Sequence, residues 1–110
     1  MKNTTIFLNS FRNDVFKLLP MREATEDGKE NHILDYITNL IITAEGAVIT
    51  FKELETMKPY IYVLNNLNYM SKHLSLDLND WRKIILNSTS SLTNLIKKLN
   101  GGEDYGRKEK

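Results

Sequence analysis

The clearest pattern in the chain is an apolar stripe between residues 76 and 100, with alternating steps of three and four. Its members are Leu78, Trp81, Ile85, Ser88, Leu92, Leu95 and Leu99. This spacing places them on one side of an α-helix, at the a and d positions of a heptad repeat. Neighbouring apolar positions widen the stripe, which favours the core helix of a bundle over a narrow dimer seam. Pairing of the same helix with a second chain stays open as an alternative.

Three further segments show helical spacing of apolar residues: residues 4–19, 32–44 and 60–72. Pro20 is expected to end the first, since proline cannot continue a helix without losing a backbone hydrogen bond. Pro59 suits the start of the third. We place Trp81 in the core, beside the first of these helices.

The second helix is expected to begin at Asn31 as its N-cap and to end at Glu45-Gly46, because glycine readily adopts positive φ. Residues 47–50 then form an extended connection. Thr50 and Glu53 have the spacing of a capping box, which predicts a short helix over residues 51–57.

The segment 21–31 has no apolar period and is predicted to be a loop. Part of it resembles the start of a calcium-binding loop in the positions of Glu23, Thr25, Asp27 and Gly28. The pattern fails at its twelfth position, where Leu34 has no carboxylate to offer. A solvated loop without a metal is therefore predicted.

The expected fold is all-α: a compact bundle of four main helices plus one short helix. The bundle is predicted to form one domain over residues 1–102. Asn100-Gly101-Gly102 should end the last helix, and residues 103–110 are expected to form a disordered charged tail.

The composition excludes several kinds of site but does not point to a particular function. The 110 residues carry a net charge of +1 and include no cysteine, which excludes disulfides, thiolate zinc sites and cysteine nucleophiles. We see no secretion signal and no apolar run of about 20 residues, so we expect a cytoplasmic protein that does not cross a membrane. Abundant asparagine and lysine are typical of AT-rich genomes and suggest a phage or mobile-element origin.

No catalytic signature emerges from the polar residues. His32 and His73 lack a second histidine at metal-binding spacing, and the hydroxyl run 88–91 lacks a nucleophile motif; such a run more often lets another helix approach closely. The acidic pairs Glu53/Glu55 and Asp77/Asp80 lie at predicted helix starts, where capping and the helix dipole explain them. We therefore predict a non-enzyme with no catalytic residues, no metal and no cofactor.

The helix over residues 60–72 predicts the best candidate binding surface. Opposite its apolar face lies an aromatic and amide-rich face with little charge, formed by Tyr62, Asn65, Asn66, Tyr69, Lys72 and His73. Tyrosine is enriched at protein interfaces because it buries a large area and keeps a polar handle. The alternative is an ordinary solvent-facing surface. Asn68 lies between the two faces, where it could cap or bridge a neighbouring helix.

Two functions remain open. The favoured one is a small protein-binding or regulatory module that docks this face on a protein partner or self-associates through helix 76–100. The second is a helix-turn-helix DNA-binding protein using residues 50–72, with Asn65 or Asn66 contacting adenine. The expected recognition helix contains few lysines or arginines to contact phosphates, so the sequence favours the protein partner.

Overall fold

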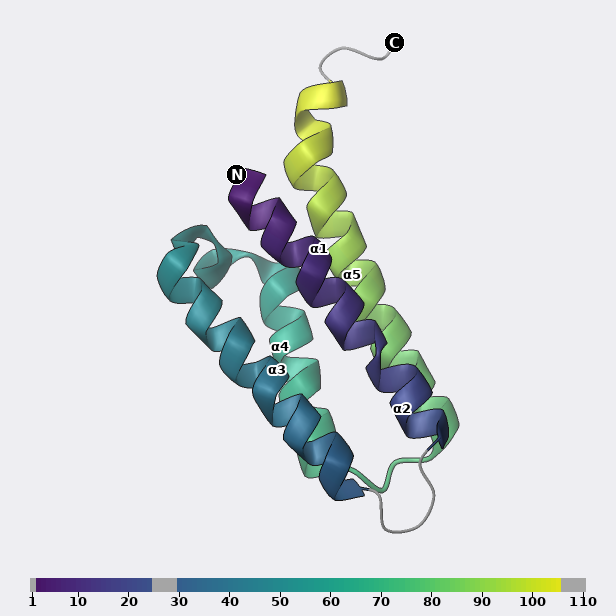
Figure 1. Cartoon of the computed structure of the whole chain (residues 1–110). Helices are drawn as coiled ribbons and strands as arrows, with labels where there is room; N and C mark the ends of the chain where they lie inside the picture. Colours follow the sequence, from purple (N-terminus) through teal and green to yellow (C-terminus); the bar gives the residue numbers. More distant parts are fainter. Residues whose placement is uncertain (1, 25–29, 106–110) are drawn as a thin grey trace.

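The computed structural model describes residues 2–24 and 30–105, and the side chains of residues 3–24 and 32–100 (Figure 1). These residues form α-helices and one 3₁₀ turn, with no strand. The elements are α1 (Lys2–Phe16), α2 (Leu18–Ala24), α3 (Glu30–Thr50), η1 (Lys52–Thr56), α4 (Lys58–Lys72) and α5 (Leu78–Tyr105). Since α1 and α2 together make the predicted first helix, the all-α bundle of four main helices and one short helix is confirmed.

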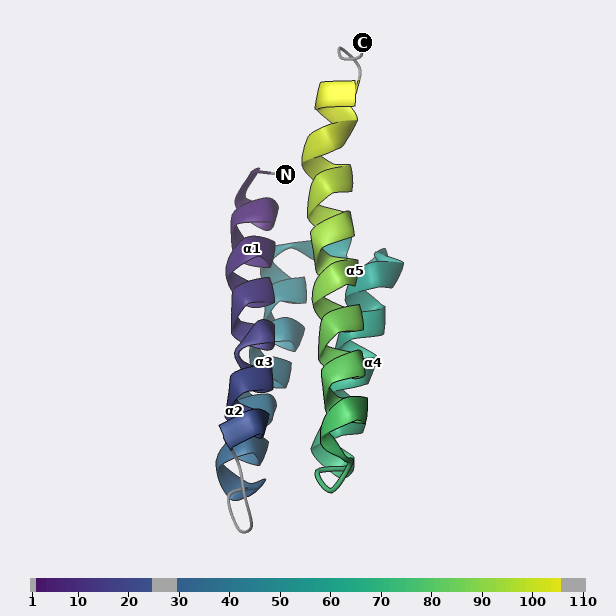
Figure 2. The ribbon, with the colours of Figure 1, turned by 90° about the vertical axis from the view of Figure 1, so that its right-hand side faces the viewer.

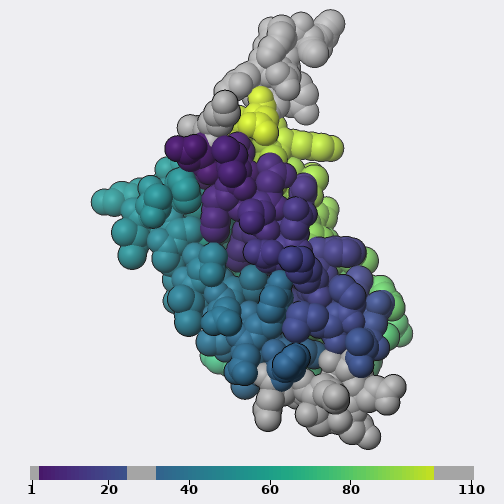
Figure 3. All heavy atoms as spheres, viewed as in Figure 1, coloured from purple at the N-terminus to yellow at the C-terminus, as the bar shows by residue number. Residues whose placement is uncertain are grey.

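The four main helices run alternately up and down in two layers, which Figure 2 separates: α1 and α3 lie on one side, α4 and α5 on the other. The helix α5 is central and packs against α1, α2 and α4. The contact between α1 and α3 is lighter, although the space-filling view shows their atoms meeting over one face (Figure 3). There the Tyr36 hydroxyl of α3 donates to the Asp14 carbonyl oxygen of α1 at 2.7 Å.

The heptad stripe of α5 lies inside the bundle, as its width predicts. Its central members are fully buried or nearly so: Trp81, Ile85, Ser88 and Leu92 at 0% exposure, and Leu95 at 3%. This confirms the core-helix interpretation. The same residues cannot contact a second chain unless the bundle opens, so self-association through α5 stays a prediction only for outward residues such as Leu86.

Four aromatic rings from separate parts of the chain fill one region of the core. Phe7 stacks on both Phe11 and Phe51, with ring centroids 5.5 and 5.6 Å apart, and Tyr60 packs at 6.0 Å from Phe11. The buried Tyr60 hydroxyl donates to the Ala44 carbonyl oxygen at 2.6 Å. The cluster thereby joins α1, α3 and α4, and burial raises the pKa of Tyr60 well above its usual value.

Pro20 breaks the first helix rather than ending it. A proline has no N–H to donate to the carbonyl four residues earlier, and that residue, Phe16, is where α1 stops. The chain becomes helical again at Leu18, and Met21 donates to the Lys17 carbonyl across the junction at 3.2 Å. The result is a bent helix whose second part, α2, continues to Ala24.

Several predicted boundaries around the segment 21–31 are therefore wrong. Its first four residues belong to α2, and Asn31 lies within α3 rather than capping it. Three positions of the weighed calcium loop, Thr25, Asp27 and Gly28, lie outside the described residues. The fourth, Glu23, accepts a hydrogen bond from Arg82 of α5 at 3.0 Å.

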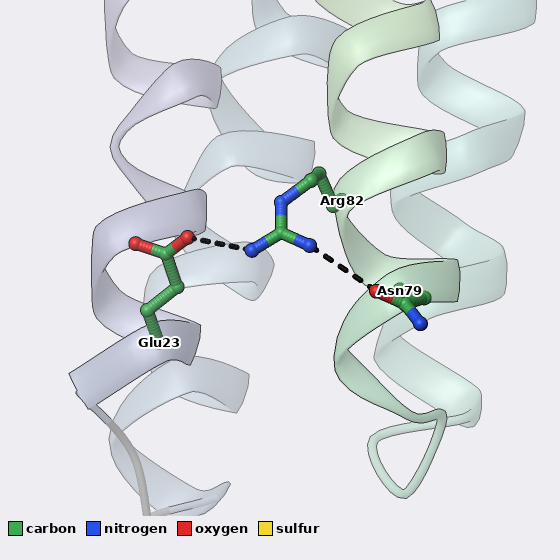
Figure 4. A network of polar contacts seen from close by, with 3 residues as sticks. All are labelled: Glu23, Asn79 and Arg82. Atoms are coloured by element: carbon green, nitrogen blue, oxygen red, sulfur yellow. Dashed lines mark hydrogen bonds and ion pairs between the residues drawn. The ribbon is translucent and has the colours of Figure 1, made fainter.

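That ion pair belongs to a small network that attaches α2 to α5 (Figure 4). The Arg82 guanidinium donates to Glu23 and also to the Asn79 side-chain oxygen at 3.2 Å. Arg22 donates to the Leu76 carbonyl at 3.1 Å and lies over the ring of the buried Trp81, 6.0 Å from its centroid. Trp81 is thus in the core as predicted, and the residue that covers it, Arg22 of α2, lies in the segment that the sequence assigned to a loop.

Gly46 does not end α3, which continues through the expected extended segment to Thr50. The reason is that Ala44 and Ala47 extend the apolar stripe of this helix and are buried against the bundle. A glycine weakens a helix interior by about 1 kcal/mol, which this packing offsets. Gly101 and Gly102 likewise lie within α5; the expected tail 103–110 thus begins inside this helix, and residues 106–110 lie outside the described residues.

The capping box predicted for the short helix is also wrong. The turn η1 starts after Phe51 without a side-chain cap, and the Glu53 carboxylate instead accepts a hydrogen bond from the Thr4 hydroxyl of α1. This bond lowers the pKa of Glu53. A long-range contact has therefore replaced the local one that the sequence suggests.

Candidate protein-binding face of helix α4

The helix α4 is fixed in the bundle by one side and presents the other to solvent. Its inner residues are Tyr60, Val63, Leu67 and Met70, with exposures of at most 1%. Pro59 near its first turn supplies a preformed backbone angle, as predicted. Since α4 packs against both α3 and α5, its inner side is covered by the bundle and its outer side faces solvent.

Two tyrosines dominate the outward side. Tyr62 is 43% exposed and Tyr69 is 47% exposed, and they lie two turns apart, about 10.5 Å along the helix axis. Tyr69 packs on the His73 ring with centroids 4.2 Å apart, so one face of its ring is already supported. Asn65, Lys72 and His73 are exposed beside them. We call the five residues Tyr62, Asn65, Tyr69, Lys72 and His73 the tyrosine face.

Asn66, expected on the same face, is turned toward α5. Its side-chain nitrogen donates to the Ser88 hydroxyl at 2.9 Å, and Ser88 is the polar member of the buried heptad stripe. Asn66 is therefore half-buried and joins two helices. Asn68 does not bridge a neighbouring helix as expected, because its amide donates to the Leu64 carbonyl one turn earlier at 3.0 Å.

The hydroxyl run in α5 serves helix packing, as the sequence suggested. Ser88 receives the bond from Asn66, and the Ser91 hydroxyl donates to the Pro59 carbonyl of α4 at 3.3 Å. Thr89 donates to the Leu86 carbonyl within its own helix. Small hydroxyl side chains thus let α4 approach α5 closely.

Residues 50–72 do not form a helix-turn-helix unit. That motif needs two α-helices joined by a turn of three or four residues. Here the expected first helix is the five-residue 3₁₀ turn η1, and Met57 alone separates it from α4. The docking geometry assumed for the DNA-binding alternative is therefore missing.

The remaining candidate residues show structural roles or none. Asp77 caps α5, since its carboxylate accepts from the Asp80 N–H at 2.9 Å, which confirms the predicted cap. His32 is exposed on α3. Over the residues described, no three His, Asp or Glu side chains gather in the manner of a metal site.

The outer side of α3 carries exposed apolar residues that the sequence analysis missed. Ile42 is 61% exposed and Ile49 is 77% exposed. Ile49 was expected in an extended connection, so its place on a helix seven residues from Ile42 was not foreseen. Residues 32–50 are also long and apolar enough to cross a membrane by length and composition, with mean hydropathy 1.3. A core helix of a bundle passes the same test, and Ile33 and Ile37 of this helix lie in the core.

Comparisons of the chain with protein-family models, with curated proteins and with solved structures found no match. The candidate site is therefore argued from residues and geometry alone.

Proposed function

We propose that this protein is a small, non-enzymatic protein-binding or regulatory module, and that it contacts its partner through the tyrosine face of α4. The observation that supports this most directly is the exposure of Tyr62 and Tyr69, at 43% and 47%, on a helix whose opposite side is fully buried. No family relationship contributes to the proposal.

The two tyrosine side chains can bury a large area on binding while losing little conformational entropy. Tyrosine loses only two side-chain torsions on binding and can bury a large area, which makes it a frequent centre of binding energy. The Tyr69 ring already packs against the His73 ring in a tilted arrangement, so less side-chain freedom is left to lose. A partner helix or strand with apolar side chains spaced about 10 Å apart would cover both rings.

The test is capture by the double variant Tyr62→Ala/Tyr69→Ala. Because both side chains are largely exposed, we expect the fold to persist, with a loss of about 1 kcal/mol or less. Partners retained by the wild-type protein from a lysate of its own host should be lost. The matched control is Ile42→Ala/Ile49→Ala, which removes comparable exposed apolar side chains from α3 and should retain them.

A photo-crosslinking residue at position 69 sharpens this test. Crosslinks formed there, but not from the same residue at position 49, would place the partner on α4. Equal capture by the tyrosine variant and the wild type would remove the tyrosine face from the proposal. Loss of capture in the α3 variant alone would move the binding surface to α3.

Self-association and the DNA-binding alternative need separate measurements. Self-association through outward residues of α5 is tested by sedimentation at several concentrations. DNA binding is tested by a gel shift at low and moderate salt, since phosphate contacts produce a steep salt dependence. A cytoplasmic location and a phage or mobile-element origin stay predictions for the native host.

A further inference from the structure

A hollow of about 450 Å³ lies between α1 and α5, away from the tyrosine face. Arg12, Asn13 and Phe16 of α1 line one side together with Lys17 of the turn that follows. Thr89 and Thr93 of α5 line the other. Small-molecule sites commonly measure about 300–1,000 Å³, so the hollow is large enough for one small ligand. Its lining combines two cations, one aromatic ring, one amide and two hydroxyls.

The cations indicate an anionic ligand. Arg12 donates from one guanidinium nitrogen to the Thr93 hydroxyl at 3.3 Å. This bond holds the side chain across the hollow and leaves other N–H groups directed away from Thr93. A planar guanidinium suits two oxygens of one phosphate or carboxylate. Among the described residues that line the hollow there is no carboxylate, and the nearest one identified, Asp14, pairs with Lys17 at the edge.

Lys17 adds a second positive charge at the edge. Its ammonium lies 3.6 Å from the Asp14 carboxylate, and the two side chains are 65% and 43% exposed. An exposed ion pair of this kind is worth little, so Lys17 can turn toward a bound anion at small cost. The two positive charges are enough to bind one phosphate group, but not a row of several phosphates.

Phe16 indicates that the ligand also has a flat ring. It is 46% exposed, and among the described rings it stacks on none, unlike Phe7 and Phe11 of the same helix. Phe16 is the last residue of α1 and its ring lines the hollow. An exposed aromatic ring beside cations is the arrangement on which nucleic-acid bases stack.

We propose that this hollow binds a nucleoside monophosphate, with the base stacked on Phe16 and the phosphate held by Arg12 and Lys17. The Asn13 amide and the threonine hydroxyls provide donors and acceptors for the sugar and the base edge. A single-stranded nucleic acid would need a longer basic track along the surface, whereas the hollow presents two cations. The site is separate from α4, so it is independent of the proposed protein-binding function.

The test is a titration followed by NMR amide shifts, with the four nucleoside monophosphates AMP, GMP, CMP and UMP as probes. For at least one of them we expect saturable shifts confined to the two walls of the hollow, in residues 12–17 and 89–93. Adenosine alone and inorganic phosphate alone should bind more weakly than AMP, because each satisfies only half of the site.

Two variants test the two halves. Phe16→Ala should weaken binding at least about fivefold through loss of stacking, and Arg12→Gln should do so through loss of the charged hydrogen bonds. Matched controls are Ile6→Ala, an exposed apolar residue of α1, and Lys83→Gln, an exposed cation of α5; both should leave the Kd unchanged. If Phe16→Ala does not fold, Phe16→Leu retains the apolar area and still removes the flat ring.

Three results would overturn the proposal. The first is the absence of saturable shifts with all four nucleotides. The second is an unchanged Kd in the Phe16 variant that folds. The third is an oligothymidylate strand that binds more than about tenfold tighter than the monophosphates, which would make the surface a strand-binding one.

Discussion

Replacing Gly46 by alanine tests whether α3 truly continues through this position. Gly46 is exposed within the helix Glu30–Thr50, and a Cβ atom placed on it meets no other atom within 4 Å. Alanine is favoured over glycine in a helix interior by about 0.8–1.0 kcal/mol. With no clash to subtract, we expect the free energy of unfolding to rise by about 1 kcal/mol. For a domain of this size, that corresponds to an increase in Tm of about 4–6 °C.

Urea and thermal unfolding followed by circular dichroism measure this effect. The urea midpoint should rise while the m-value stays unchanged, which indicates a change in stability rather than in exposed surface. Gly46→Asn is the companion variant. Within a helix asparagine should gain less than alanine, whereas at a left-handed helix end asparagine would be tolerated and alanine would destabilise. A loss of stability in Gly46→Ala, with Gly46→Asn near the wild type, would show that α3 ends at Gly46.

Four further predictions concern the core and the assembly. Tyr60→Phe removes the buried bond to the Ala44 carbonyl and should cost about 1 kcal/mol, against about 0.5 kcal/mol or less for the exposed Tyr62→Phe, as measured by urea unfolding. Burial raises the pKa of the Tyr60 hydroxyl, so above about pH 10 the unfolded chain loses the hydroxyl proton before the folded chain does. The free energy of unfolding of the wild type should therefore fall as the pH rises above about 10. The fall should be smaller in Tyr60→Phe, which has no such proton. Trp81→Phe should change stability by about 1 kcal/mol or less, because two effects offset each other: it leaves a small cavity, and it removes a buried indole N–H that has no hydrogen-bond partner in the described structure. Trp81→Ala should cost about 3–5 kcal/mol. Equal losses in the two variants would contradict this account. If α5 mediates self-association, Leu86→Lys should abolish the concentration dependence of sedimentation, and a concentration-independent wild-type monomer would exclude self-association altogether.

The sequence predicts well those elements whose apolar spacing agrees with their local signals. In α5 the stripe from Trp81 to Leu95 is regular over several turns, and burial in the bundle follows it directly. In α4 the proline at the start and the apolar spacing agree, so its inner and outer sides could be assigned in advance.

Predictions failed where a local signal competed with packing against distant residues. Gly46 resembles a helix end, but Ala47 on the next position is buried and keeps the helix intact. The Glu53 carboxylate has the spacing of a cap, but Thr4, which is distant in sequence, offers it a hydroxyl. Sequence spacing alone does not predict that α1 lies close enough to η1 for this hydrogen bond to form.

The candidate site shows the same division. The exposure of Tyr62 and Tyr69 follows from helix periodicity alone. The inward turn of Asn66 does not, because it depends on Ser88 of α5 lying within hydrogen-bond distance. Apolar spacing does not separate the exposed Phe16 from the buried Val15 next to it; only the position of each side chain in the bundle does.

The pairing of α1 with α5 has a consequence for how the chain is made in the cell. The most extensive contact of α1 is with a helix that begins at Leu78, far along the chain. At a translation rate of about 5–20 residues per second, several seconds pass before that partner has been synthesised. During this interval Leu8, Phe11 and Val15, which are buried in the finished bundle, have no complete surface to cover them. Apolar surface exposed in this way is prone to aggregation, so slow translation between α1 and α5 should reduce the yield of folded protein.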